Sequence, residues 1–367
     1  MCKKIFSIIL SLSCVLSLAA CSGGESSSSE SMSSISSSSS SVSSSSSVSS
    51  SSASSSSSES EKLDLSKVDN TKKVTDAIKI NDDVGAYLYI PDTKIDTPLL
   101  DSMKNYEKTS DFLKQYYNRF EEVVENGETV NKHLSNLNWA KEEIGEYTSP
   151  SPYMWGKATY TSREELSPNL AVLGYNNGVL DPEKKFKEAW DAIDAISETE
   201  EYKNLSSAEK RSLFLNKYAK VDDYPNGPEF AQLFHYRDED FVKSHPYIVF
   251  STEKDNFIYE VFAVSYLEEN PEFAYFSSGI SHEKAYSMAK QAIDHSIWLY
   301  PEVEIKADDK FISLSTTPYT YFENGYDNER IRFVITGRLL PADAELKETC
   351  KVEKNPSPVA PKLPEKK

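Results

Sequence analysis

The feature that most constrains how this chain can fold is a run from residue 22 to residue 60 that is almost entirely serine, with scattered Glu. Such a segment has too few apolar side chains to offset the entropy of ordering, so residues 22–61 are expected to form a disordered tether. Its mean end-to-end span would be roughly 35 Å. We therefore expect one domain over residues 62–341, about 280 residues and enough for one sizeable core. The Lys-, Glu- and Pro-rich residues 342–367 are expected to form a disordered tail.

The first 21 residues have the pattern of a targeting segment. Lys3 and Lys4 precede an apolar run over residues 5–18 that is too short to span a bilayer, and a Leu-Ala-Ala-Cys sequence ends at Cys21. This indicates a lipoprotein signal peptide, with Cys21 lipidated and holding the mature chain to the extracellular face of the bacterial cytoplasmic membrane. The alternative is a plain secretory signal in which the cysteine is there by chance.

Composition excludes several classes of function. The net charge of -18 argues against nucleic acid and against direct docking on an anionic membrane. Cys2 and Cys14 leave with the signal and Cys21 is lipidated, so Cys350 remains alone and no disulfide is expected. The sequence has no CxxC pair or HExxH spacing, and it gives no signal for a metal, nucleotide or haem. We expect no cofactor.

A strand pattern near the C-terminal end of the domain carries the candidate site. Ile312, Leu314 and Thr316 alternate with polar residues at the period of two that is typical of a strand. Pro318 cannot donate to a strand ladder, so Thr317 is expected at a strand end. A second strand is expected over residues 332–339.

These residues resemble a known family. Leu-Ser-Thr-Thr at 314–317, the turn at 321–328 and Arg-Phe-Val-Ile-Thr-Gly-Arg-Leu at 332–339 resemble the last two strands of class B sortases, the cysteine transpeptidases of Gram-positive cell surfaces. Residues 84–99 and 230–250 are also similar to segments of that family. The resemblance implies a mainly β fold with helices (α+β). It would be a sortase-like closed β-barrel with an N-terminal helix, a helix between the late strands and a helical insertion.

The departures from the family fall on its catalytic positions. The family's nucleophilic cysteine corresponds to Thr317, and the catalytic histidine of the turn after an earlier strand corresponds to Tyr175. Arg332 matches the third catalytic residue, an arginine that steadies the substrate or the oxyanion. Arg330 fits that offset less well. His245, which precedes Pro246, is interpreted as structural.

The two substitutions remove the chemistry that the family needs. A thiol can be tuned to a thiolate, whereas a threonine hydroxyl depends on an adjacent base. Tyr175 is poorly suited to be that base, because a phenol with a pKa of about 10 is protonated at neutral pH. Thr317 and Tyr175 could also be ordinary strand-end packing residues. Cys350 is disfavoured as a substitute nucleophile because it lies in a charged tail without a histidine motif.

The resulting interpretation is a cell-surface lipoprotein whose barrel binds a peptide, a surface protein or a cell-wall fragment without cutting it. Two alternatives stay open. One is an active transpeptidase or hydrolase that uses Thr317 or Cys350 on the sorting signals of surface proteins. The other is an accessory protein that docks a partner through its helical insertion.

Several further elements are expected along the chain. A helix is expected over residues 67–80, and strands are expected over residues 155–160 and 169–174. Helices are also expected within residues 106–147, where Phe112, Tyr116 and Phe120 recur at helical spacing.

The later helices include those of the insertion. That segment, residues 178–228, should hold two amphipathic helices, one beginning at Pro182 and one opened by a capping box at Ser206 and Glu209. These helices either pack on the barrel as decoration or form a lid or docking surface. Residues 281–300 are expected to form one more amphipathic helix.

Overall fold

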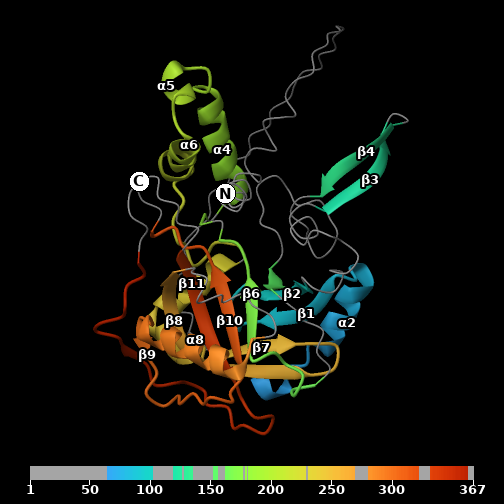
Figure 1. Ribbon diagram of the computed structural model, residues 1–367, viewed down its shortest axis with the longest axis vertical. Coiled ribbons are helices and arrows are strands. Elements are labelled where there is room, and N and C mark those ends of the chain that lie inside the picture. The colour runs from blue at the N-terminus through green and yellow to red at the C-terminus, as the bar shows by residue number, and fades with distance from the viewer. Residues whose placement is uncertain are drawn as a thin grey trace, which may run out of the picture.

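The protein is described by a computed structural model, drawn in Figure 1. The residues that the structure describes are 64–101, 119–125, 128–134, 152–155, 162–176, 178–179, 181–228, 230–268, 280–321 and 331–362. The expected signal peptide and tether, including the lipidation site Cys21, lie outside these residues.

Eight strands close into a barrel in the order β1-β2-β5-β6-β10-β11-β8-β7. Their bounds are β1 (Val84–Tyr89), β2 (Asp96–Asp101), β5 (Tyr153–Trp155), β6 (Asn169–Leu173), β7 (Tyr247–Ser251), β8 (Asn256–Glu268), β10 (Phe311–Thr316) and β11 (Ile331–Leu339). The β2–β5 and β6–β10 pairs are parallel and the others are antiparallel. The expected barrel is confirmed, including the two late strands and the first two.

Successive side chains of β10 and β11 point to opposite faces, so these strands contribute to a core inside the barrel and to a second core outside it. Ile312, Leu314, Phe333 and Ile335 face the barrel interior and are fully buried. Val334, from the opposite face of β11, packs outside the barrel under helix α8. Because both faces of these strands are covered, all six residues of β10 are buried, and this part of the barrel is a fixed support for its ends.

The helices are η1 (Leu65–Lys67), α2 (Thr71–Ile80), α4 (Pro182–Asp194), α5 (Glu200–Lys203), α6 (Ser207–Ser212), η3 (Leu213–Ala219), η4 (Phe230–Arg237), α7 (Glu239–Ser244) and α8 (His282–Asp294). The expected helix between the late strands is α8, which ends at Asp294 rather than at residue 300. Two residues of β9 (Trp298–Leu299) follow it. None of the described helices has the length and apolar character that a membrane span needs.

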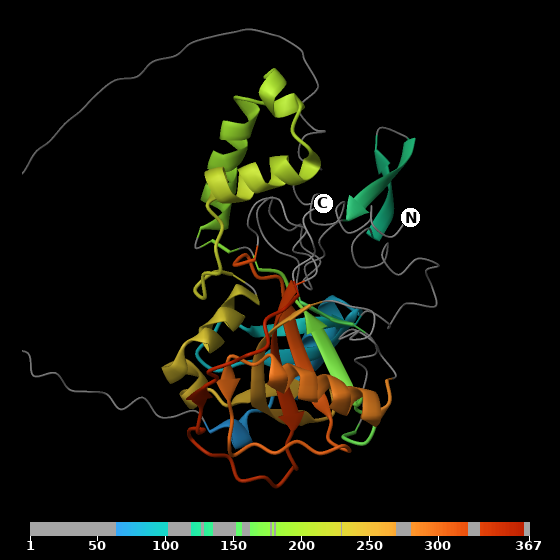
Figure 2. The same cartoon turned by 60° about the vertical axis from the view of Figure 1, so that its left-hand side comes forward.

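The helices α4, α5, α6 and η3 form an arm that projects from one end of the barrel (Figures 1 and 2). Local sequence chemistry starts these helices where expected. The Asp181 carboxylate accepts from the amide of Lys184 at 3.1 Å. The capping box of Ser206 and Glu209 is present in both directions. The arm has its own core, which includes Ala189, Ile193, Phe214, Leu215 and Ala219.

In the described residues 119–125 and 128–134, strands are found where helices were expected. Strand β3 (Arg119–Glu125) pairs with β4 (Glu128–Leu134) as an antiparallel hairpin. The helical prediction was wrong for Phe120, which lies in β3, while Phe112 and Tyr116 lie outside the described residues. The two strands flank Asn126-Gly127, a residue pair that strongly favours a two-residue hairpin turn. Residues 156–160 of the expected strand also lie outside the described part.

The C-terminal residues correct another expectation. Residues 342–362 are not a disordered tail in the structure but lie along the barrel, where β12 (Glu353–Lys354) pairs with β9. Val352 is buried, and the Asn355 side chain donates to the carbonyl of Ser296 at 2.7 Å. A few apolar and amide contacts are enough to order this segment despite its charged composition.

Candidate functional site

The candidate site lies at one edge of the barrel, where three strand ends meet. Strands β6 and β10 are parallel, with Leu173 opposite Ser315, so their carboxyl ends lie at the same edge. Strand β11 begins there, because Thr316 pairs with Phe333. Topology alone therefore brings the residues after β6, the residues after β10 and the first residues of β11 together.

Thr317 and Arg332 are in direct contact. The Arg332 guanidinium Nη1 donates a hydrogen bond to Thr317 Oγ1 at 2.7 Å. Thr317 directly follows β10, and Arg332 is the second residue of β11, so both side chains are carried by rigid strand ends. Both residues are candidate site residues from the sequence, and the structure places them together.

Tyr175 lies at the same edge, two residues after the end of the neighbouring strand β6. The ladder between β6 and β10 continues past the strand end, since the amide of Gly174 donates to the carbonyl of Ser315 at 3.1 Å. The Tyr175 carbonyl accepts from the amide of Phe230 at 3.0 Å. The three positions taken from the resemblance therefore share one edge. Their catalytic roles stay a prediction.

A glycine before Tyr175 explains why the chain turns so closely there. A Cβ atom on Gly174 would lie 2.4 Å from the ring of Phe230, which is buried in the main core. Only a residue without a side chain allows this approach. Packing against Phe230 therefore requires a glycine at position 174, in the turn that resembles the family.

Asp223, which no sequence pattern indicated, accepts four hydrogen bonds at this edge. Its side chain is buried, and Oδ1 accepts from Asn176 Nδ2 at 3.0 Å and from the amide of Tyr319 at 2.6 Å. Oδ2 accepts from the amide and the hydroxyl of Thr320. Asp223 is 96 positions from Tyr319 in the sequence, so no local pattern could have indicated this contact.

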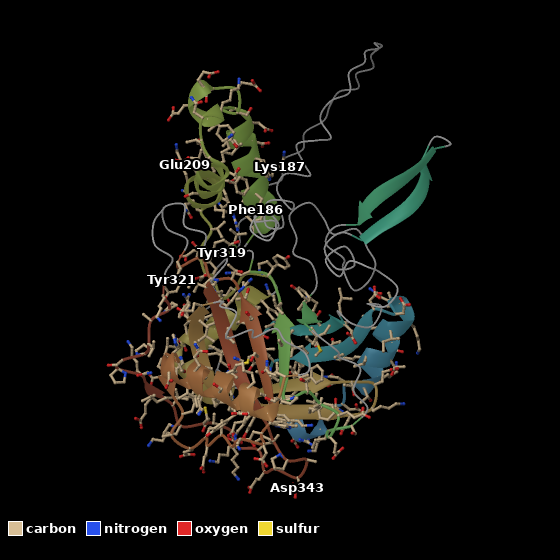
Figure 3. All side chains as sticks on the ribbon, in the orientation of Figure 1. Phe186, Lys187, Glu209, Tyr319, Tyr321 and Asp343 are labelled. Atoms are coloured by element: carbon tan, nitrogen blue, oxygen red, sulfur yellow. The ribbon has the colours of Figure 1, made fainter. Side chains whose placement is uncertain are left out.

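An aromatic cluster supports the other side of the loop after Thr317. Tyr321 packs edge-on against Tyr266 of β8 with ring centroids 5.2 Å apart, and Tyr266 contacts Phe333 at 5.0 Å. Burial raises the pKa of Tyr266 to about 12, so its hydroxyl is protonated at neutral pH. Figure 3 shows Tyr319 and Tyr321 at the foot of the arm, next to the barrel end.

Cys350 does not contact the Thr317–Arg332 pair. Its Sγ donates to the carbonyl of Val242 at 3.3 Å, and desolvation followed by the charge of Glu260 raises its pKa to about 11. Glu260 binds Arg338, which lies six positions along β11 from Arg332, roughly 20 Å in an extended strand. The thiol is therefore protonated at neutral pH and lies apart from the candidate site.

The histidines whose side chains the structure describes also lie in other contacts. His245 Nε2 is 2.9 Å from the Asp92 carboxylate, and its ring stacks on Phe241 at 3.9 Å. His235 stacks against the same Phe241 ring at 5.0 Å, and burial lowers its pKa. These contacts fit the structural role expected for His245. His282 begins α8 and His295 caps its end.

Within the described residues, no group of three or more His, Cys, Asp or Glu side chains is arranged to hold a metal ion. The chemistry available at the edge is that of a guanidinium, hydroxyls, an amide and a buried carboxylate. This set can donate to a carbonyl or a carboxylate and can accept from backbone amides.

The chain is thus a closed α+β barrel with a hydroxyl–guanidinium pair at one edge and a helical arm beside it. No family model and no curated protein matches it. Among solved structures it is similar to Clostridium perfringens sortase B, with 16% identity over 73% of this chain and 99% of that chain and a TM-score of 0.41.

Two further similar structures are also class B sortases. A Staphylococcus aureus sortase B–substrate complex has 14% identity over 74% of this chain and 85% of that chain, with a TM-score of 0.42. Sortase B from Bacillus anthracis in complex with AAEK1 has 15% identity over 73% and 84%, with a TM-score of 0.40.

Proposed function

We propose that this protein is a lipid-anchored, sortase-like barrel that has lost transpeptidase activity and binds a peptide segment without cutting it. The ligand would be a sorting-signal-like peptide, a segment of a surface protein or the peptide part of a cell-wall fragment. The proposal places the protein on the extracellular face of the bacterial cytoplasmic membrane, held by Cys21 and the serine-rich tether.

The contact between Thr317 Oγ1 and the Arg332 guanidinium carries the proposal. The resemblance puts a thiol nucleophile at Thr317, and the structure has there a hydroxyl that accepts a hydrogen bond from a cation at 2.7 Å. The guanidinium occupies one of the two lone pairs of this oxygen, and a hydroxyl that attacks a carbonyl also needs a base to remove its proton, which a cation cannot do. The same guanidinium and hydroxyl can still donate hydrogen bonds to the carbonyl groups of a bound peptide.

Among the residues that the structure describes, the groups placed at this edge are poorly suited to be the missing base. Tyr175, at the position of the family's histidine, is a phenol, and Asp223 is already an acceptor for four hydrogen bonds. Cys350 is held protonated away from this edge. In the described part of the chain, this distribution supports binding over catalysis.

The binding proposal is tested with labelled peptides of the LPxTG and NPQTN types. We expect the chain from residue 22 to bind at least one type, and Arg332→Gln to weaken that binding about tenfold or more, because the site loses the guanidinium that contacts Thr317. The measurement is fluorescence anisotropy over a titration. A double variant, Arg338→Gln with Glu260→Gln, removes an ion pair between β11 and β8 and should bind like the parent chain. Equal binding by Arg332→Gln and the parent would contradict the proposal.

A second candidate function is partner docking through the arm. The place where the arm joins the barrel, residues 178–179 and 221–223, is here called the neck, and its geometry favours this function. The amide of Asp222 donates to the carbonyl of Gly178 at 3.0 Å, so the arm leaves and rejoins the barrel at one point. The arm has its own core, built mainly from α4 and η3, and projects from the barrel (Figure 2). An element with its own core can present a surface to a partner.

The neck allows a clean deletion. Residues 180–220 can be replaced by a two-residue Asn-Gly turn because the flanking backbone atoms are already hydrogen-bonded. The partner would be a wall-associated protein, identified by crosslinking on intact cells. Crosslinking that disappears on deletion supports docking, and undiminished crosslinking of the same protein counts against it.

A further inference from the structure

The loop after Thr317, residues 318–321, is held by the arm as well as by the barrel. The amides of Tyr319 and Thr320 donate to the two oxygens of the Asp223 carboxylate, at 2.6 Å to Oδ1 and 2.9 Å to Oδ2. Asp223 lies four residues after the last helix of the arm, which ends at Ala219. The loop that begins at the candidate site therefore depends on a side chain at the foot of the arm.

Asp223 also reaches the other side of Thr317. Its Oδ1 accepts from Asn176 Nδ2 at 3.0 Å, and the same nitrogen donates to the carbonyl of Thr317 at 3.2 Å. Asn176 Oδ1 in turn accepts from the amide of Gly178 at 2.8 Å. The carboxylate is 2% exposed, so these bonds are shielded from water and expensive to lose.

The neck of the arm fits closely against the same loop. Gly178 has φ +59°, and a Cβ there would lie 2.5 Å from the carbonyl oxygen of Asp222 and 2.8 Å from Cδ2 of Tyr319. The Tyr319 ring packs against the core of the arm. Arg237 Nη2 donates to the carbonyl of Asp223 at 2.7 Å and ties the neck to the barrel. Moving the arm would therefore move the loop.

We infer that Asp223 is a positioning residue that holds Thr317 against Arg332, and that the attachment of the arm is thereby a condition for the geometry of the site. The arm then contributes to the geometry of the candidate site. A partner that shifts the neck would release the loop and change what the site binds. The inference deepens the proposed function, but its test uses no ligand, so the two can fail separately.

Asp223→Asn is the informative change because it keeps the size of the side chain. Each carboxylate oxygen accepts from two donors. Whichever way the amide of an asparagine is turned, its NH₂ group faces one pair of these donors. Asp222→Asn is the matched control, since it removes the same charge from an exposed neighbour. Asp222 Oδ1 accepts from the amide of Asp223 at 2.7 Å, and an asparagine keeps that oxygen.

The reporter is a thiol introduced by Thr317→Cys in the chain from residue 22. Beside the Arg332 guanidinium, its pKa should lie below the value of about 8.5 for a free thiol. The pKa is obtained from the pH dependence of iodoacetamide alkylation, with peptide mass spectrometry separating this site from Cys350. Amide hydrogen exchange of Tyr319 and Thr320 is measured in the same variants.

The direction in which the pKa of the introduced thiol changes distinguishes a positioning role of Asp223 from a direct effect of its charge. If Asp223 positions the loop, Asp223→Asn moves the thiol away from Arg332, raises its pKa and slows its alkylation at pH 7 at least threefold. Removing a negative charge alone would lower the pKa and speed alkylation. The inference also expects faster exchange at Tyr319 and Thr320, and no such change in Asp222→Asn.

Thr320→Val guards against a variant that fails to fold. It removes only the hydroxyl bond of an exposed residue to Asp223 and should shift the thiol pKa in the same direction by a smaller amount. An unchanged or lowered thiol pKa in both Asp223→Asn and Thr320→Val would overturn the inference.

Discussion

At the scale of single residues, the contact between Thr317 and Arg332 defines the candidate site. Thr317 keeps the strand-end position and the contact with Arg332, but a hydroxyl cannot be brought near ionisation by one guanidinium. Both residues could be predicted from the sequence because each belongs to a continuous strand motif. Asp223 could not, because its four donors come from segments distant in the sequence.

Cys350 gives a prediction at this scale. Its pKa is raised from 9.0 to about 11, so at pH 8 its thiolate fraction should be about 100-fold lower than in the unfolded chain. Alkylation of native protein by iodoacetamide should be slower by about that factor than in guanidinium chloride. The chain from residue 22 is suitable because Cys350 is its sole cysteine.

The same thiol has a consequence for stability. The folded state keeps the proton up to about pH 11, whereas the unfolded state loses it near pH 9. The folded state therefore binds more protons in this window, and the free energy of unfolding should fall as pH rises from 9 to 11. Native alkylation as fast as that of the unfolded chain would contradict both expectations.

At the scale of elements, local chemistry was easier to predict than pairing. The capping box of Ser206 and Glu209 was predicted because it needs only residues three apart. The helix over Phe120 was wrong because an apolar spacing was given more weight than the Asn126-Gly127 turn signal, and pairing of β3 with β4 decided the outcome. The C-terminal end of α8 was predicted too late, because Trp298 and Leu299 form β9, whose partner β12 lies far away in the sequence.

Ser206→Ala tests the arm as an element. The change removes the hydroxyl that accepts from the amide of Glu209 at 3.3 Å and should destabilise α6 by about 1 kcal/mol. Hydrogen exchange of the α6 and η3 amides should accelerate roughly fivefold, while exchange in β10 stays the same. Ser207→Ala, one residue into the helix, is the control and should leave exchange nearly unchanged. Equal protection in the two variants would show that the cap does not support the arm.

At the scale of the whole molecule, the C-terminal segment packs against the barrel domain and pairs with β9. The composition of residues 342–367 indicated disorder, but composition cannot show that Val352 finds a buried place or that Cys350 and Asn355 find backbone partners. Only the assembled barrel provides these partners. The domain therefore extends to at least residue 362.

Truncation measures what this segment contributes. A chain ending at Pro341 loses the burial of Val352, about 1.5 to 3 kcal/mol by itself, and the pairing of β12 with β9. Its Tm should fall by about 5 to 10 °C. A chain ending at Lys362 keeps every described contact of the segment and should melt like the parent. Equal Tm values for the two truncations would show that the segment lies on the barrel without stabilising it.

The central claim is that a sortase-like barrel binds its peptide without cutting it. The most direct measurement is mass spectrometry of LPxTG- and NPQTN-type peptides after incubation with the chain from residue 22 and hydroxylamine, beside the double variant Thr317→Cys with Tyr175→His. We predict intact peptide from the parent chain and a hydroxamate product from the double variant, whose thiol and imidazole would meet Arg332 at the same edge. A hydroxamate product from the parent chain that is lost in Thr317→Ala would contradict the account.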